Sequence, residues 1–343
     1  MTHEQKTAVL LIGFGGPTRP EEVKPFLMSV VGGMKVPPER LAEVLRHYEV
    51  IGGVSPFNAI TQRQKNALEA FLLSKGISIP VSAAYRHSTP SFKDAFESYK
   101  HFGVERVIGF ILASFRSSVS FKRYVDRVEE GRREAGADTV IVEYTEPFFH
   151  DELYLNAQAE RINEIWGTWT PEKKAATEMI FTAHSIPTAI CEASCGENDF
   201  RCYGYQFHEA ARHISSEIGA KNWRVAYQSR SGNPHDPWLE PDIKDTIGTL
   251  NTKKVRNVLV VPVGFLCDNA EVIYDLDHEA KAVAEDRGLG YYRAGTVSDH
   301  PIFIEMIAKN ILEKLEKSGY NELNKRHSEA KPKNLKNEIL PLR

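Results

Sequence analysis

A single histidine stands at the end of a strongly apolar segment in the middle of the chain. Residues 179–181 form an apolar run, His184 follows, and Ser185 and Pro187 break the pattern. A run of this kind followed by a turn signal predicts a buried strand that presents its last side chain at the strand end. Ligands of open α/β sheets bind beyond the carboxyl ends of strands, and histidine exchanges protons near neutral pH. The pattern therefore indicates a proton-transfer site, with a histidine that only hydrogen-bonds across a strand end as the alternative.

A second apolar segment, residues 258–266, leads into a run of acidic side chains. A helix with an apolar stripe is predicted after it, and Glu271, Asp275 and Glu279 recur at every fourth position, so they share one face of that helix. We call these three residues the acidic ladder. A capping box with Asp268 at the N-cap would explain Glu271 but not the other two carboxylates. A row of hard oxygen ligands beside a strand end suits a divalent cation in transit.

The two stretches together resemble the signatures of the ferrochelatases, enzymes that insert ferrous iron into a porphyrin. Residues 182–187 are similar to the family's signature around its catalytic histidine, and residues 264–277 to the signature that carries its catalytic glutamate. The resemblance implies that His184 and Glu271 are catalytic. His184 and Glu271 are expected to be proton acceptors, metal ligands or both, and the row of carboxylates predicts that Asp275 and Glu279 also contact the metal.

The reaction that the resemblance implies sets clear demands on these side chains. The product would be protohaem, made from protoporphyrin IX and ferrous iron by a metal-chelating lyase in the last step of haem biosynthesis. Two N–H protons must leave the ring as iron enters, so a neutral His184 is expected to accept a proton and Glu271 to share or relay it. The macrocycle must also bend, and a site that grips a distorted ring favours the transition state.

Five further positions are expected to contact the porphyrin. Phe14 stands where relatives that use coproporphyrin carry a tyrosine, and this difference favours protoporphyrin IX. Ser55 and Pro56 lie in a greasy, glycine-rich loop that the resemblance makes the lip of the porphyrin cleft. Arg86 follows a predicted strand and is expected to pair with a propionate, with a surface arginine as the alternative. Trp238 in a Pro-Trp-Leu stretch is expected to pack behind the histidine.

The four cysteines of the chain are clustered in its second half. Cys191, Cys195 and Cys202 fall within 12 residues directly after the histidine turn, and Cys267 follows the second apolar segment. Four thiolates suit a zinc ion or a [2Fe–2S] cluster, whereas disulfides are rare in the cytoplasm. Some ferrochelatases contain a [2Fe–2S] cluster, although the animal pattern places three ligands in a C-terminal extension, which has no cysteine here. We expect the four cysteines to hold one [2Fe–2S] cluster.

Apolar runs of strand length alternate with helical segments along the chain. Strands are expected at residues 8–12, 81–85, 107–112, 140–144, 179–181, 225–228, 258–263 and 290–293. This alternation predicts an α/β protein with parallel sheets flanked by helices. The resemblance implies two similar Rossmann-like domains. We expect the first at residues 1–155, with the cleft lip, and the second at 156–319, with the catalytic residues and cysteines, followed by a polar tail at 320–343.

The glycine-rich turn after the first strand is not a dinucleotide-binding motif. Thr18 occupies the place of the third glycine, so nucleotide binding is not predicted. Thr18 and Glu21 instead have the spacing of a capping box for the following helix.

Composition limits the classes of protein that the chain can belong to. It has 343 residues, 42% of them hydrophobic and 26% charged, with a net charge of −3. These values fit a globular enzyme of two domains and give no reason to expect nucleic-acid binding. No apolar stretch approaches the roughly 20 residues that span a bilayer, and no signal peptide is evident. We expect a cytoplasmic protein. Peripheral contact with the inner face of the membrane stays open, because porphyrin and haem are hydrophobic.

Four alternatives to a protoporphyrin ferrochelatase stay open. A coproporphyrin ferrochelatase would differ only in its porphyrin. A cobalt or nickel chelatase of related fold would lack the lip and the Pro-Trp-Leu stretch. A non-catalytic porphyrin or haem carrier would not need the acidic ladder. An iron–sulfur redox or sensor protein would retain only a vestigial porphyrin site.

Overall fold

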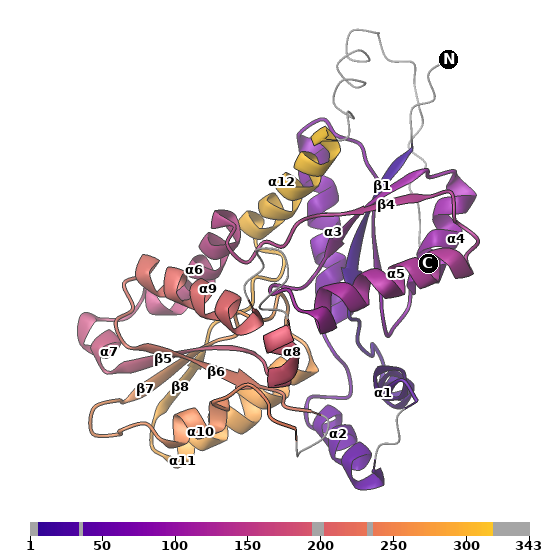
Figure 1. The fold of residues 1–343 in the computed structure, drawn as a ribbon. Helices are drawn as coiled ribbons and strands as arrows, with labels where there is room; N and C mark the ends of the chain where they lie inside the picture. The colour runs from indigo at the N-terminus through magenta and orange to yellow at the C-terminus, as the bar shows by residue number, and fades with distance from the viewer. Residues whose placement is uncertain (1–5, 34–36, 194–201, 232–235, 318–343) are drawn as a thin grey trace.

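The computed structural model describes residues 6–33, 37–193, 202–231 and 236–317. Two four-stranded parallel sheets lie at its centre, each flanked by helices (Figure 1). Sheet A has the strand order β2-β1-β3-β4, and sheet B has the order β6-β5-β7-β8, so the same topology occurs twice. The predicted α/β fold with two similar Rossmann-like units is therefore confirmed.

The strands lie close to the predicted ranges. Sheet A consists of β1 (Thr7–Gly13), β2 (Val81–Tyr85), β3 (Arg106–Ile111) and β4 (Ile141–Tyr144). Sheet B consists of β5 (Thr177–His184), β6 (Trp223–Gln228), β7 (Asn257–Val261) and β8 (Gly290–Arg293). The largest difference is in β5, which is longer at both ends than the apolar run because its polar residues also pair with β6 and β7. His184 is consequently the last residue of the strand.

Helices cover both sheets. Those of the first half are α1 (Val23–Val31), α2 (Pro38–Val50), α3 (Phe57–Ser74), α4 (Phe92–Phe102) and α5 (Arg123–Glu134), with short turns η1 (Pro20–Glu22) and η2 (Ser118–Lys122). Those of the second half are α6 (Glu152–Trp166), α7 (Pro171–Ala175), α8 (Thr188–Ala193), α9 (Tyr203–Glu217), α10 (Ile243–Gly248), η3 (Val272–Ala280), α11 (Lys281–Asp286) and α12 (Pro301–Lys317). The helix predicted from residue 61 begins earlier, at Phe57.

One hydrophobic core joins the two sheets. The largest cluster of buried side chains includes Leu11 and Phe110 from sheet A and Phe181 and Val261 from sheet B. The last described helix, α12, runs back along α3 and α6 (Figure 1). The expected boundary between residues 155 and 156 falls inside α6, and the expected tail at 320–343 lies outside the described residues. The division into two domains at those positions stays a proposal.

The capping box predicted at Thr18 is wrong, and so is the alternative explanation of Glu271 as part of a capping box. The backbone N–H and the hydroxyl of Thr18 both donate to Glu22, not to Glu21, and the following turn begins only at Pro20. Ahead of η3, the side chain that accepts a backbone N–H is Asn269, which receives the N–H of Val272 at 2.8 Å. Both interpretations failed because a neighbouring residue offers the same chemistry one position away.

No helix in the described part of the chain is long and apolar enough to cross a membrane.

Candidate functional site

His184 and Glu271 meet where β5 and β7 end. Gly264, in the turn after β7, donates its N–H to the carbonyl of Thr182 at 3.0 Å. A Cβ atom at position 264 would lie 2.6 Å from the Cα of Ala183, so only glycine allows the chain to pass so close to β5. This close approach brings the segment that carries Glu271 back beside the end of β5.

The imidazole of His184 is held in one orientation. Its Nδ1 lies 2.5 Å from the carbonyl oxygen of Ser185, and its own backbone carbonyl accepts the hydroxyl of Tyr203 at 2.9 Å. Nε2 faces Oε1 of Glu271 at 3.7 Å, with the two side chains 31% and 51% exposed. With Nδ1–H donating to a carbonyl, Nε2 is the atom left for proton exchange with the carboxylate and with a ligand.

The protonation state of His184 differs from the neutral one expected. Burial opposes a charge on the ring, but the Glu271 carboxylate outweighs it and raises the pKa of His184 to about 9. At neutral pH the resting pair is therefore an imidazolium beside a carboxylate. His184 must lose this proton before it can accept one from a substrate.

The acidic ladder continues along η3, a π-helix, and its three carboxylates have different surroundings. Asp275 accepts a hydrogen bond from the hydroxyl of Ser229, and Gln228 Nε2 lies 3.5 Å from the same oxygen. Burial raises the pKa of Asp275 to about 7. Glu279 is paired with Lys244 at 2.9 Å. The sequence spacing predicted the row correctly but could not show that its outermost member already has a cationic partner.

The predicted metal-contacting residues do not form a ready-made metal site. Among the described residues, no three His, Cys, Asp or Glu side chains are grouped so that they could hold a metal ion. His184, Glu271, Asp275 and Glu279 are instead distributed along the strand end and one helix.

Arg293 is a site-supporting residue that the sequence did not single out. Its guanidinium contacts both oxygens of Asp268 at 3.2 Å and both oxygens of Asp277, at 2.6 and 2.9 Å. These two carboxylates flank Glu271 in sequence, so the guanidinium anchors both ends of the catalytic segment, residues 268–277, to β8. Strand-end arginines are common, and nothing in the spacing predicted this pairing.

A second group of side chains lies at the corresponding end of sheet A. The ring of Phe14 lies 4.7 Å from that of His87, measured between centroids. Arg86 Nε is buried and has no hydrogen-bond partner among the described residues, and the charges of Arg123 and Arg127 act on Arg86. Burial, with help from Arg86 and Arg127, lowers the pKa of His87 to about 4. This end of sheet A is rich in cations.

Helix α2, which precedes the lip loop, contacts the catalytic segment directly. His47 in α2 stacks on Tyr274 in η3 with ring centroids 3.7 Å apart. Tyr48 belongs to a buried cluster that packs against Ala270, beside Glu271. Burial raises the pKa of Tyr48, and the charge of Glu271 raises it further. The aromatic residues of α2 therefore border the carboxylate that the sequence predicted to be catalytic.

The remaining predicted porphyrin contacts are placed around these two strand ends. Ser55 is buried and donates its N–H to Pro17 at 2.8 Å, and Pro56 precedes α3. Trp238 pairs through its backbone with Pro187, in the turn after His184, and its indole N–H is buried with no hydrogen-bond partner in the described part of the chain. Ser55 and Pro56 thus border sheet A, and Trp238 borders sheet B.

One tyrosine connects the two strand ends. Burial raises the pKa of Tyr124, whose hydroxyl interacts electrostatically with Arg86 and with Glu271. A cation at the end of sheet A and a carboxylate at the end of sheet B therefore face the same side chain. That the predicted site residues from both halves of the chain form one site stays a proposal.

The cysteines are only partly brought together. The thiol of Cys191 hydrogen-bonds to Cys202, next to Gly204 and Tyr227. Cys267 is buried elsewhere, beside Asp268 and near Arg63, and burial raises the pKa of its thiol. Cys195 lies outside the described residues. The described part of the chain does not bring Cys191, Cys202 and Cys267 into one metal-binding group.

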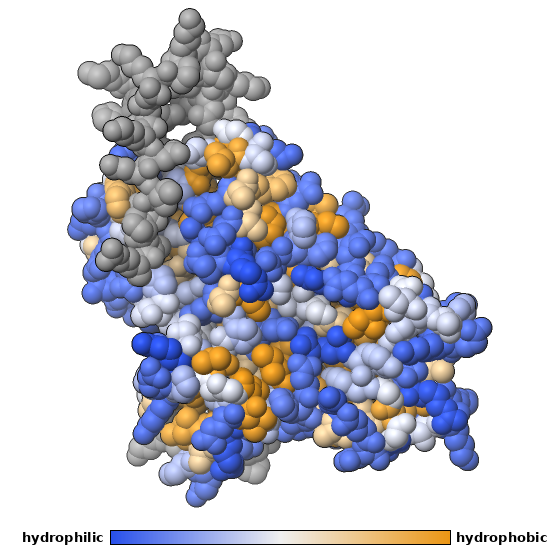
Figure 2. Space-filling view, turned by 180° about the vertical axis from the view of Figure 1, so that it is seen from behind, coloured by the Kyte–Doolittle hydropathy of each residue, from blue (hydrophilic) through white to orange (hydrophobic). Residues whose placement is uncertain are grey.

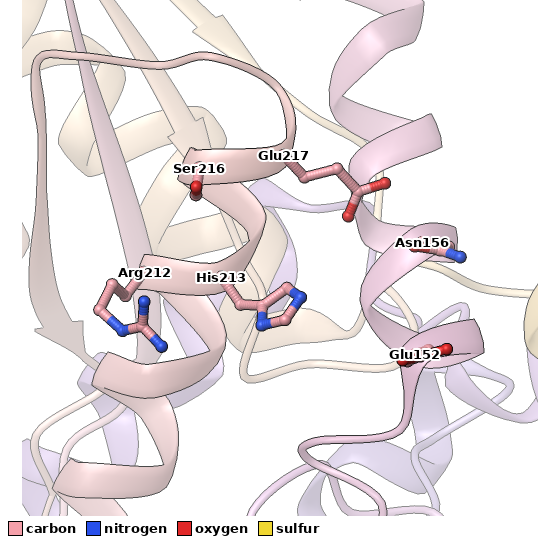
Figure 3. A pocket seen from close by; sticks show the side chains of 6 residues that line it. All are labelled: Glu152, Asn156, Arg212, His213, Ser216 and Glu217. Atoms are coloured by element: carbon pink, nitrogen blue, oxygen red, sulfur yellow. The ribbon is translucent and has the colours of Figure 1, made fainter.

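A cavity that the sequence did not predict lies between α6 and α9 (Figure 3). It measures about 450 Å³ and is lined by Glu152, Asn156, Arg212, His213, Ser216 and Glu217. Every lining side chain is polar or charged, which does not suit a planar apolar macrocycle. The cavity shares no residue with the site at the strand ends.

The chain is similar in sequence to known proteins. The sequence model of the family described as Ferrochelatase matches residues 6–315. The chain is 35% identical over 323 residues to the Ferrochelatase of Rhodopirellula baltica, covering 93% of this chain and 90% of that protein. It is 37% identical over 311 residues to the Coproporphyrin III ferrochelatase of Mycobacterium tuberculosis, covering 91% and 86%.

Similar solved structures support the fold alone. SirB from Bacillus subtilis with Fe3+ superimposes with a TM-score of 0.57 at 14% identity, covering 92% of this chain and 98% of that one. The sirohydrochlorin chelatase SirB in complex with cobalt, from a subspecies of the same bacterium, gives a TM-score of 0.54 at 14% identity, covering 91% and 96%.

Proposed function

The chain belongs to the ferrochelatase family, whose members are metal-chelating enzymes that insert iron into porphyrins, and from this premise we propose that His184 and Glu271 carry the reaction. The observation that carries the proposal is the approach of His184 Nε2 to Glu271 Oε1, 3.7 Å apart at neighbouring strand ends. A titratable pair in this position can handle the protons that leave the porphyrin.

The reaction exchanges two protons for one ferrous ion at the centre of the ring. Glu271 is half-exposed, and its carboxylate can accept a proton directly. His184 is fixed through Nδ1, so its Nε2 passes protons to and from that carboxylate. Proton transfer by positioned side chains typically accelerates a reaction by about 10²–10⁴-fold. Ferrous iron is a substrate here, and we propose that it reaches Glu271 along Asp275 and Glu279.

The end of sheet A supports binding of the porphyrin's carboxylates. Arg86 has a buried Nε without a hydrogen-bond partner among the described residues, and burial makes an unmatched donor costly. A propionate would satisfy this donor and form a charge-assisted hydrogen bond. The charges of Arg123 and Arg127 add to the positive potential at this edge. We propose that the propionate edge of the ring binds here and that Ser55, Pro56 and Trp238 border the ring.

The preferred porphyrin is the finer part of the proposal. We propose protoporphyrin IX because Phe14 has no oxygen to offer the metal and packs against His87. Coproporphyrin III is the second candidate, since the mycobacterial relatives are named for it and the sheet A edge holds several arginines near one another. Coproporphyrin carries more carboxylates than protoporphyrin, so the arginines and Phe14 favour different substrates.

A competition experiment decides between the two porphyrins. Equal concentrations of both are incubated anaerobically with ferrous iron, and the ratio of the two products gives the ratio of their kcat/KM values. We expect protoporphyrin IX to win in the wild type and Phe14→Tyr to move the ratio toward coproporphyrin III. Phe102→Tyr, on exposed α4, is the matched control. A wild type that prefers coproporphyrin III would overturn the assignment.

Helices α1 and α2 also suit peripheral contact with a membrane surface. Met28 and Val30 of α1 and Val50 of α2 are exposed hydrophobic side chains. Hydrophobic surface gathers at the lower left of Figure 2, on the side of the molecule where α1 and α2 lie. We propose that this surface receives the greasy porphyrin or releases haem near a bilayer, which co-sedimentation with lipid vesicles would test.

A [2Fe–2S] cluster with four cysteine ligands is not supported by the described residues. Cys191 and Cys202 are in contact, but Cys267 has other neighbours and Cys195 lies outside the described part. No step of the proposed reaction passes through a cluster. It stays a prediction, and iron and labile sulfide analysis of anaerobically purified protein tests it.

A further inference from the structure

The outermost carboxylate of the acidic ladder is already neutralised by a lysine. Lys244 Nζ lies 2.9 Å from Oε2 of Glu279. The lysine comes from the first turn of α10, which is fixed because Asp242 accepts the backbone N–H of Lys244 at 2.8 Å. A metal ion that enters along the ladder would therefore meet an ion pair at Glu279 instead of a free carboxylate.

The middle of the ladder is different, because the hydrogen-bond partners of its carboxylate are neutral groups. Asp275 is contacted by the hydroxyl of Ser229 and the amide of Gln228. Gln228 is 1% exposed, and its Oε1 has no hydrogen-bond partner among the described residues. A buried acceptor of this kind calls for a ligand, and a cation beside Asp275 would supply one. The Gln228 oxygen without a partner is an observation separate from the carboxylate spacing, and it also supports passage of a cation beside Asp275.

The ion pair at Glu279 can open more easily than the pairs that Arg293 forms with the same segment. Both of its side chains are partly exposed, 42% for Lys244 and 35% for Glu279. Exposed pairs of this kind contribute little to stability, and lysine is a flexible point charge. Arg293 contrasts with it, because its side chain is 15% exposed and its planar fork holds two carboxylates with both oxygens of each. Asp268 and Asp277 are thus kept out of the ion path, and Glu279 is not.

We propose that Lys244 is the resident counter-ion of Glu279, which an entering divalent cation must displace, so that Lys244 sets the apparent affinity for iron. The inference rests on the proposed function of the ladder. The lysine prevents Glu279 from holding a cation tightly at the entrance, where it would obstruct transfer to Asp275 and Glu271. Repulsion between the ammonium and a divalent ion is the physical basis, and it weakens as salt screens it.

The test is the KM for ferrous iron in Lys244→Gln, measured anaerobically at saturating porphyrin. We expect it to fall about 3–10-fold at low ionic strength, with the porphyrin KM unchanged, because removal of one nearby charge from a half-exposed site has effects of this size. The difference should disappear at about 0.5 M salt, where the Debye length is only a few ångströms. Lys244→Arg keeps the charge and should keep the wild-type KM within about twofold.

Lys281→Gln is the matched control, because Lys281 pairs with Glu285 one turn beyond the ladder. Its iron KM should equal that of the wild type. If Lys244→Gln has an unchanged or higher iron KM while it folds and turns over, Lys244 is only a structural contact and the inference is overturned.

Two further measurements separate this failure from failure of the proposed function. An unchanged iron KM in Glu279→Gln would show that iron does not enter along the ladder, and it would leave the proposed chelatase function intact. A wild type that forms no haem would remove the function itself. Calorimetric titration with Co²⁺ in the absence of porphyrin would then still test the counter-ion role of Lys244. Tighter binding of Co²⁺ to Lys244→Gln than to the wild type would support this role, and equal binding would contradict it.

Discussion

The two sheets of the molecule share one strand order but carry opposite charges at their carboxyl ends. Beyond sheet A, Arg86 lies in the field of Arg123 and Arg127. Beyond sheet B, His184 faces Glu271 and Asp275. The same difference separates their histidines. The pKa of His87 is lowered to about 4 by burial and nearby arginines, whereas carboxylates raise that of His184 to about 9.

This contrast teaches that the fold supplies two equivalent edges and that charge assigns their tasks. A porphyrin carries carboxylates on one edge and receives a metal cation at its centre. The cationic end of sheet A suits the first of these groups, and the acidic end of sheet B suits the second. Tyr124 interacts electrostatically with both Arg86 and Glu271, which supports the proposal that the two edges border one site.

The largest expected effect is at the histidine of sheet B. His184→Ala should lower kcat for iron insertion by at least about 100-fold, because proton transfer at Nε2 is lost. Porphyrin binding, measured by fluorescence quenching, should persist. His213→Ala, in the polar cavity between α6 and α9, should leave kcat unchanged. Turnover of His184→Ala near the wild-type rate would remove the histidine from the mechanism.

The arginine of sheet A should affect binding and not the chemical step. Arg86→Gln removes a charge-assisted hydrogen bond to a propionate and should raise the porphyrin KM about 10-fold with kcat nearly unchanged. Arg133→Gln, exposed on α5, is the control. A loss confined to kcat would mean that the two edges do not divide the work as proposed.

The smallest effect concerns the histidine of sheet A and the stability of the fold. Native His87 stays neutral down to about pH 4, whereas the same histidine in the unfolded chain takes up a proton below about pH 6.5. The contribution of His87 to the free energy of unfolding should therefore rise with pH between these values. It should be fully present above about pH 6.5 and lost as the pH falls toward 4.

Substitution of His87 tests this pH dependence. His87→Gln should remove about 1–2 kcal/mol of it, after allowance for partial exposure of the ring, as measured by urea unfolding at several pH values. His101→Gln, exposed at the end of α4, is the control. Equal pH slopes in His87→Gln and the wild type would show that burial does not depress this pKa.

The sequence predicted most of the fold because the strands are apolar runs bounded by turn residues. Val81–Tyr85 and Gly290–Arg293 begin and end where the pattern placed them. β5 was underestimated because Thr177 and Glu178 are polar, although pairing with β7 buries both. Local chemistry was less decisive at helix starts, where Glu22 and Asn269 took roles expected of their neighbours.

The sequence predicted only those features of the site that lie within one continuous segment of the chain. Strand-end position gave His184, and spacing gave the row from Glu271 to Glu279. The partners of this row come from distant segments, as Lys244 and Ser229 show. No pattern within either stretch reports such long-range pairs. The raised pKa of His184 has the same origin, because it depends on the distance to Glu271 in space.

The most direct test of the account is anaerobic single-turnover insertion of ferrous iron into protoporphyrin IX by Glu271→Gln, followed by the haem spectrum. Glutamine keeps the shape of the side chain but removes the carboxylate that faces His184. The account predicts an insertion rate at least about 100-fold below that of the wild type, with porphyrin affinity within about twofold. An insertion rate equal to that of the wild type would contradict the assignment of the chemistry to the acidic end of sheet B.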